Sequence, residues 1–368
     1  MKLERLDVSV YRIPTEQPEA DGTFQWDSTT LVLVEAHADS GQRGLGFTYG
    51  AAAAATLIHE MLAQAVIGCP VENVGAAWDA MVRAVRNIGR PGIASHAISA
   101  VDTALWDLKA RVFEKPLFQL LGARRETIPL YGSGGFTSYT EGELVEQFSA
   151  WASEGFSRVK MKVGKDWGAK PEEDVTRARA AREAIGPNVE LFVDANGGYK
   201  VKQAIAQAHR FAEYGVSYFE EPVAFDFLDQ LAFIRQHIPM ALASGEYGYD
   251  LYDFRNPLLA GAVDILQADA TRCLGVTGCL AAGELAYSFG VPFSTHTAAS
   301  IHAHIACAVP QIEHVEYFFD HARIEHMLFD GALKPVHGEL RPDPSRPGLG
   351  LELKKHDAEK WRVSQWSI

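Results

Sequence analysis

Short apolar runs, each followed by a segment with helical spacing of apolar positions, dominate the chain from about residue 128 to residue 317. The runs recur about every 20 to 32 residues, which is the length of one strand, loop, helix and loop in a parallel barrel. They cover residues 159–163, 189–193, 216–219, 241–243, 265–267, 291–294 and 314–317. No glycine-rich phosphate-binding motif follows the first run, so the pattern favours a barrel over a dinucleotide-binding fold.

The first third of the chain shows a different pattern. Residues 1–14 alternate charged and apolar side chains as a strand does, and residues 31–35 form a second short apolar run. Beyond Ser95, apolar residues recur at helical spacing over residues 97–108. We therefore expect an α+β unit ahead of the barrel, and a return loop in the Pro- and Gly-rich residues 341–353.

Composition and charge exclude some classes of partner and location for this protein. The 368 residues are 47% hydrophobic, which is ordinary for a globular protein with a sizeable core. The net charge of -13, without a cluster of lysine and arginine, argues against nucleic acid as a partner. Residues 1–14 lack the apolar run of a secretory signal, and the apolar stretch 51–69 contains polar residues, so no membrane association is expected. We expect a cytoplasmic protein whose four scattered cysteines are reduced.

The residue type at the end of each run is the most informative feature. Barrel active sites are built at the C-terminal ends of the strands. Acids, lysines and a histidine stand at or just after these ends: Lys160, Lys162, Asp194, Glu220, Glu221, Glu246, Asp269 and His296. In a barrel these side chains would converge on one site.

Three of the acids, Asp194, Glu220 and Glu246, follow successive runs and could surround one point. Carboxylates at such distances repel one another unless a cation lies between them, and hard oxygen ligands suit Mg²⁺. Each acid taken alone is more often a turn residue or a helix cap. The joint pattern therefore predicts a magnesium site.

Lys160 and Lys162 are two residues apart, so on a strand both point to one face, while Met161 points to the other. A solvated edge strand would show the same pattern. In a barrel mouth, the neighbouring ammonium group and a divalent ion would each lower the pKa of Lys162. This predicts a neutral amine that can act as a base.

Asp269 and His296 follow adjacent runs and could form a pair. The carboxylate would fix the tautomer of the imidazole and raise its basicity, which gives a second acid/base group opposite Lys162. A lone histidine is more often structural, as we expect for His302. Glu316, on the last run, is either a further acid, a hydrogen-bond partner of the substrate or part of a structural salt bridge.

Together these motifs resemble the enolase superfamily, and within it the mandelate racemase subgroup, over nearly the whole chain. The resemblance is carried by Lys160-Met161-Lys162, Val193-Asp194-Ala195-Asn196, Phe219-Glu220-Glu221-Pro222, Ser244-Gly245-Glu246, Asp269 with Gly275-Val276-Thr277, Ser294-Thr295-His296 and the helical residues 100–107. Two positions depart from the family pattern. Leu274 stands where a glycine is usual, and Arg272 stands where a lysine is often found.

The resemblance implies an α/β fold: a modified (β/α)₇β barrel over residues 126–340 and an α+β capping domain over residues 1–125, completed by residues 341–368. It implies Mg²⁺ held by the three acids named above, with Lys162 and the His296/Asp269 pair as bases on opposite faces of the substrate. Lys160 would lie near the substrate carboxylate, and Glu316 would hydrogen-bond the substrate.

The reaction expected from these residues begins with removal of the proton next to a carboxylate, with Mg²⁺ and Lys160 stabilising the enediolate. We favour a lyase of carbohydrate acid catabolism that dehydrates a sugar acid, a small-molecule carboxylate, to a 2-keto-3-deoxy acid. A racemase or epimerase of a hydroxy acid or amino acid derivative remains open, as does a non-catalytic homologue that binds a metal and a ligand.

Two further residues are expected to contact the substrate. The polar residues 21–27, which include Trp26, could cover the barrel mouth and contact hydroxyl groups, although a plain surface turn would look the same. Tyr49 is a second candidate contact. A homo-oligomer is also expected.

Overall fold

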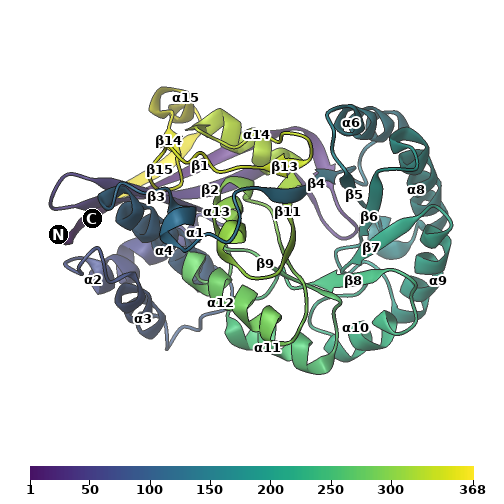
Figure 1. Ribbon diagram of the computed structural model, residues 1–368, viewed down its shortest axis with the longest axis horizontal. Helices are drawn as coiled ribbons and strands as arrows, with labels where there is room; N and C mark the ends of the chain where they lie inside the picture. Colours follow the sequence, from purple (N-terminus) through teal and green to yellow (C-terminus); the bar gives the residue numbers. More distant parts are fainter.

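The computed structural model describes residues 1–368 as a closed parallel β-barrel next to an α+β cap (Figure 1). The barrel strands are β4 (Ile128–Gly134), β5 (Arg158–Lys162), β6 (Glu190–Asp194), β7 (Val216–Glu220), β8 (Ala241–Ser244), β9 (Ile265–Ala268), β10 (Phe293–Thr295) and β11 (Ile312–Phe318). Strand β11 pairs in parallel with β4 and closes the barrel. The predicted fold class is confirmed, and each of the seven apolar runs is a barrel strand.

Helices surround the barrel strands (Figure 1). They are α6 (Glu141–Ser153), α7 (Lys165–Gly168), α8 (Pro171–Ile185), α9 (Val201–Ala212), α10 (Leu228–Arg235), α11 (Leu251–Ala260), α12 (Gly275–Ser288), α13 (Ala299–Ala308) and α14 (Phe319–Leu328). Local sequence fixes where several of them begin. A capping box between Thr140 and Glu143 starts α6, Pro171 stands at the first turn of α8, and the Asp250 side chain caps α11.

The cap is an antiparallel sheet with helices on one face. Its strands are β1 (Leu3–Ala20), β2 (Gln25–Ala38), β3 (Arg43–Tyr49) and β15 (Arg362–Ser367), in the order β15-β1-β2-β3. Its helical segments are α1 (Ala53–Leu57), the π-helical η1 (Ile58–Leu62), α2 (Ala63–Val66), α3 (Val74–Ala84) and α4 (Ile93–Val112). Because β15 pairs with β1, the end of the chain completes the cap sheet.

Shorter elements connect these two parts. They are α5 (Leu117–Leu120), β12 (Phe329–Asp330), β13 (Glu339–Leu340), β14 (Glu352–Leu353) and α15 (Lys355–Glu359). Strand β13 pairs antiparallel with β4 at the barrel, and β14 pairs with β12. None of the helices in the chain is long and apolar enough to cross a membrane.

The cap sheet separates two hydrophobic cores. Along β2, Val32 and Val34 pack into the core shared with the cap helices, while Leu31 and Leu33 belong to the core of the barrel. This alternation is the period-2 geometry of a strand with both faces buried. Because the barrel core continues into the cap sheet, packing marks no single boundary residue, and the predicted domain limits stay a prediction.

Strand β3 lies unusually close to α4, and glycine makes this possible. A Cβ atom added to Gly46 would lie 2.3 Å from the Ala100 carbonyl oxygen and 2.3 Å from the Ala104 nitrogen. Gly46→Ala should therefore push the helix off the sheet and destabilise the protein by about 2–3 kcal/mol, seen as a lower melting temperature. Gly75→Ala is the matched control, because a Cβ there meets nothing within 4 Å and helix α3 gains from alanine. Equal melting temperatures for the two variants would contradict this packing.

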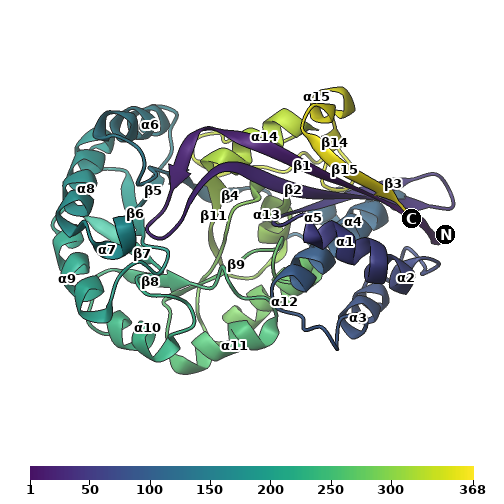
Figure 2. The same cartoon turned by 180° about the vertical axis from the view of Figure 1, so that it is seen from behind.

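The hairpin of β1 and β2 reaches from the cap across the barrel (Figure 2). At its tip, Asp21 Oδ1 accepts hydrogen bonds from the backbone N–H groups of Thr23 and Phe24, which fixes the turn. The Gly22 carbonyl accepts the Trp167 N–H at 2.9 Å. A Cβ on Gly22 would lie 2.5 Å from the Ala195 carbonyl oxygen, just beyond β6. The tip therefore packs directly on the C-terminal ends of the barrel strands.

Candidate active site

The barrel brings the predicted acids together at its C-terminal end. The parallel register places Lys162 beside Asp194 and Asp194 beside Glu220. Glu246 follows the end of β8 by two residues. Carboxylate oxygens of Asp194, Glu220 and Glu246 all lie within 4.8 Å of one another, and all three residues are buried.

The three acids of this group are arranged like the ligands of a metal ion, with oxygens that no group of the chain satisfies. Burial, and after it the nearby Asp194 carboxylate, raise the pKa of Glu220 well above its usual range, as is expected for crowded acids without a cation between them. Glu220 Oε1 and Glu246 Oε2 are buried and have no hydrogen-bond partner in the chain. Buried oxygens without partners are costly, and three hard oxygen donors are what Mg²⁺ prefers. The residues present therefore fit a magnesium ion.

Both lysines of β5 point to the acidic group. Lys160 is fully buried, and its Nζ lies 2.6 Å from Glu220 Oε2, 2.9 Å from Glu316 Oε1 and 3.6 Å from Asp194 Oδ2. Lys162 Nζ pairs with Asp194. The shared face predicted from the spacing of the two lysines is thus the face that lines the site.

Without a cation at the acidic group, the pKa of Lys162 is raised rather than lowered. Burial and the Lys160 ammonium do lower the pKa, but the Asp194 carboxylate, helped by Glu246, outweighs them and raises it. The reason is that the sequence pattern showed the neighbouring lysine but not the ion pair with Asp194. The predicted lowering depends on a divalent ion bound at Asp194 as well as on the Lys160 ammonium, so it stays a prediction for the magnesium-bound site.

Asp269 and His296 form the predicted pair. His296 Nδ1 lies 2.9 Å from Asp269 Oδ2, so the carboxylate accepts a hydrogen bond from Nδ1–H. The other ring nitrogen, Nε2, is then free to accept a proton. Although burial acts to raise the pKa of Asp269, the His296 hydrogen bond and the positive charge of Arg272 lower it. His296 Nε2 faces the acidic group, 3.5 Å from Glu246 Oε2 and 3.9 Å from Glu316 Oε2.

His302, expected to be structural, holds the segments that carry this pair. It is fully buried, its Nε2 accepts the Ala270 N–H at 2.8 Å, and its Nδ1 lies 2.7 Å from the Thr297 carbonyl. Ala270 follows Asp269, and Thr297 follows His296. His302 therefore ties together the ends of β9 and β10 through their backbones.

A cavity of about 170 Å³ lies between the strand ends and the hairpin, and we call it the site cavity. Lys162, His296 and Glu246 line it from the barrel, and Asp21 and Trp26 line it from the hairpin. Two predicted bases and one acid of the ligand set thus share one space. Within predicted residues 21–27, positions 25–27 are part of β2 rather than a loop.

Tyr49 and Glu316 do not line the site cavity. The Tyr49 ring instead stacks on His321, with centroids 3.5 Å apart, and His321 does line the cavity. Glu316 is fully buried and accepts the Thr297 N–H at 2.8 Å. Direct contact of either residue with a substrate stays a prediction, and the structure places Tyr49 behind His321.

Sequence reasoning missed His321 and did not assign a role to Asn196. His321 lies three residues beyond β11, inside α14, and its Nδ1 is buried without a partner. Burial and nearby His296 lower the pKa of His321 to about 3, so its imidazole is neutral. The only available signal was a histidine shortly after the last apolar run.

The loop after Asp269 explains the two departures from the family pattern. Leu274 has φ 69°, the left-handed conformation that glycine adopts without cost, and its side chain is buried in the cap core. The leucine side chain thus adds packing between the barrel and the cap, at the cost of a strained backbone conformation. The Arg272 guanidinium lies 3.2 Å from Glu246 Oε1 and 3.4 Å from Asp269 Oδ2, so it links the acidic group to the His296 pair.

Comparison with known proteins shows two family matches that together cover most of the chain. Residues 8–122 match the mandelate racemase/muconate lactonizing enzyme N-terminal domain. Residues 143–358 match the family described as enolase C-terminal domain-like.

Among curated relatives, the chain is 31% identical to D-galactarolactone cycloisomerase of Agrobacterium fabrum, over 99% of each chain. It is 30% identical to arabinonate dehydratase of Saccharolobus solfataricus, over 90% of each chain.

Two solved structures extend the comparison. A mandelate racemase/muconate lactonizing enzyme-like protein from Rubrobacter xylanophilus is 50% identical, with a TM-score of 0.95, over 99% of this chain and 100% of that one. L-talarate/galactarate dehydratase from Salmonella typhimurium, liganded with Mg and L-lyxarohydroxamate, is 26% identical with a TM-score of 0.91, over 100% of this chain and 94% of that one.

Proposed function

Because the chain belongs to the mandelate racemase/muconate lactonizing enzyme family of the enolase superfamily, we propose that it is a magnesium-dependent enzyme that removes the proton next to the carboxylate of a sugar acid. The observation that carries this proposal is the site cavity. Lys162 and His296 both line it, beside a buried group of three carboxylates. The magnesium-liganded dehydratase structure supports the metal. When bound, the ion supplies positive charge that stabilises the negative charge developing on the substrate carboxylate.

The residues of the chain then have distinct tasks. Asp194, Glu220 and Glu246 hold the ion, and Lys160 places a fixed positive charge beside them. Lys162 Nζ and His296 Nε2 are the groups that move protons, since both line the site cavity. Asp269 keeps the His296 proton on Nδ1, so Nε2 can accept or donate.

Dehydration is the outcome that we favour. One base takes the α-proton, His296 gives a proton to the β-hydroxyl, and water leaves. The enol that remains tautomerises to a 2-keto-3-deoxy acid. The relative named arabinonate dehydratase and the talarate/galactarate dehydratase structure support this outcome. A screen of sugar acids for keto-acid formation tests it.

A ring-opening elimination is the second candidate, favoured by the relative named D-galactarolactone cycloisomerase. In that reaction the leaving group is a ring oxygen that stays attached to the product, so the same proton transfers give an isomer instead of releasing water. Mass spectrometry separates the two outcomes, because dehydration lowers the mass by one water and ring opening leaves it unchanged.

Racemisation and simple ligand binding are outcomes of the same screen. A racemase or epimerase would invert the α-carbon without forming a keto acid, which chiral chromatography detects. A non-catalytic homologue would bind a sugar acid without any turnover. The cytoplasmic location and the homo-oligomer expected from the sequence stay predictions.

Trp26→Ala should change substrate affinity more than the rate of proton removal. The indole lines the site cavity from the hairpin, and its Nε1–H donates to buried Glu19 at 2.9 Å. We expect KM to rise about 5- to 10-fold, or the preference among sugar acids to change, with kcat within about 3-fold. Steady-state kinetics with Trp26→Phe as the control separates ring contact from the lost donor. A change in melting temperature alone would assign the residue to structure.

A further inference from the structure

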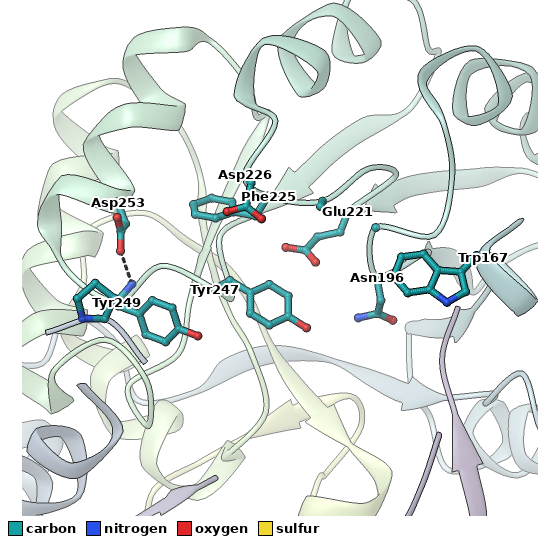
Figure 3. Close-up of a pocket in the computed structure, with 11 residues that line it drawn as sticks. Trp167, Asn196, Glu221, Phe225, Asp226, Tyr247, Tyr249 and Asp253 are labelled. Carbon is teal, nitrogen blue, oxygen red and sulfur yellow. Dashed lines mark hydrogen bonds between the residues drawn. The ribbon is translucent and has the colours of Figure 1, made fainter. Parts of the chain in front are cut away.

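A second cavity, of about 490 Å³, lies next to the site cavity, and we call it the vestibule (Figure 3). Loops after β5 to β8 form it, together with Pro91 of the cap. Asn196 and Tyr247 line both cavities, so the two cavities adjoin at these side chains. The vestibule is the larger of the two, and a small acid bound beside Lys162 would leave it free.

The charge of the vestibule differs sharply from that of the site cavity. Its lining includes the carboxyl groups of Glu221, Asp226 and Asp253, and no lysine, arginine or histidine. Arg272 lies over the Tyr247 ring at 5.1 Å, but it lines the site cavity and is paired there with Glu246 and Asp269. A second carboxylate placed in the vestibule would therefore meet the negative charges of Asp226 and Asp253 and no positive charge.

Aromatic side chains line the same space. Trp167 and Tyr247 are 69% and 41% exposed, which is high for such large rings. Trp167 follows Asp166, and both have left-handed backbones, with φ 58° and 55°, which is costly for residues other than glycine. The Trp167 N–H is held by the Gly22 carbonyl at the hairpin tip. The backbone that carries this exposed indole is thus held by the hairpin tip, and the indole itself is not packed in the core.

Polar groups complete the surface. Asn196 Oδ1 is buried without a hydrogen-bond partner at the junction of the two cavities. Figure 3 shows the Asn196 amide, the Glu221 carboxyl group and the Tyr247 hydroxyl pointing into the same space. Flat aromatic faces together with hydrogen-bond acceptors match a hydroxylated sugar unit, whose C–H faces pack on rings while its hydroxyls donate to carboxylates.

We propose that the vestibule is a substrate subsite for the end of the molecule farthest from the reacting carboxylate, and that it takes a neutral hydroxylated unit, such as a sugar ring, rather than a second carboxylate. This inference rests on the proposed function and narrows it. The substrate class becomes aldonic acids, including those extended by a glycosyl unit, and excludes aldaric diacids.

The test uses calorimetric dissociation constants for the magnesium-loaded protein with three matched acids. Gluconate is the reference, glucarate adds a distal carboxylate, and cellobionate adds a glucosyl unit at O4. Galactonate and galactarate repeat the charge comparison with another configuration. We expect the diacid to bind at least about 5-fold more weakly than its aldonate. We expect cellobionate to bind at least as tightly as gluconate.

Two variants assign these differences to the vestibule. Trp167→Ala should weaken cellobionate about 5- to 10-fold while gluconate stays within about 2-fold. Asp226→Asn should reduce the penalty against the diacid about 3-fold. Asp226 makes no hydrogen bond or ion pair in the chain and Trp167 is exposed, so both variants should fold. Phe233→Ala and Asp229→Asn are matched controls on the exposed side of α10, outside both cavities, and should change neither ratio.

The outcomes distinguish this inference from the proposed function. Tighter binding of the diacid, or ratios that neither vestibule variant changes, would overturn the subsite even if the enzyme exchanges or converts sugar acids. Failure of all five acids to bind would count against both the subsite and the proposed sugar-acid substrate.

Discussion

Glu220→Gln should abolish most of the activity while the protein stays folded. Glu220 ends β7, and its carboxylate is one of three whose oxygens lie within 4.8 Å of one another. The substitution replaces one anionic ligand of this group by a neutral amide of the same shape, so Mg²⁺ binds more weakly. The substrate carboxylate then lacks the cation that would stabilise its developing charge. We expect kcat to fall at least about 100-fold.

Two measurements check this result. Calorimetry with Mg²⁺ should show weakened binding to the variant, and thermal unfolding should show that the fold persists. Glu325→Gln is the matched control, since Glu325 is also buried but lies outside the acidic group. Full turnover by wild-type protein in metal-free buffer would contradict the magnesium site.

Lys162→Ala and His296→Asn should separate the two proton transfers. If Lys162 takes the α-proton, Lys162→Ala should lose both solvent deuterium exchange at the α-carbon and keto-acid formation, by about 100- to 10,000-fold. His296→Asn should keep the exchange but form little keto acid, because the β-hydroxyl then has no proton donor. Both residues line the site cavity, so neither effect needs a change in fold.

The pattern depends on the configuration of the substrate. For an acid of opposite configuration at the α-carbon, His296 is itself the base, and exchange should disappear in His296→Asn instead. The exchange is followed by proton NMR in deuterated buffer, beside a keto-acid assay. Exchange that persists in both single variants would show that neither residue is the base.

The fold and the site could be predicted to different degrees from the sequence. Period-2 and helical patterns are local, so seven of the eight barrel strands and the helix after Ser95 could be located directly, whereas β4 was not among the predicted runs. The acids, lysines and histidine at strand ends converge because a closed parallel sheet brings every such end to one rim. No single residue indicated the site, and only the joint pattern did.

What could not be predicted depends on contacts between distant segments. Trp26 and Tyr49 both belong to the cap, yet only Trp26 reaches the site cavity, because the hairpin extends across the barrel while Tyr49 packs behind His321. The pKa of Lys162 depends on its ion pair with Asp194, from the neighbouring strand. Leu274 in a left-handed conformation is understandable only once its side chain is seen in the cap core.

The most direct test of the central claim is deuterium exchange by the wild-type protein. The magnesium-loaded enzyme is incubated in deuterated buffer with a library of sugar acids, and the α-hydrogen of each acid and the mass of each product are followed. We predict that at least one acid exchanges its α-hydrogen or forms a keto acid, and that removing Mg²⁺ stops both. A folded, magnesium-bound protein that leaves every α-hydrogen in place would contradict α-proton removal as its function.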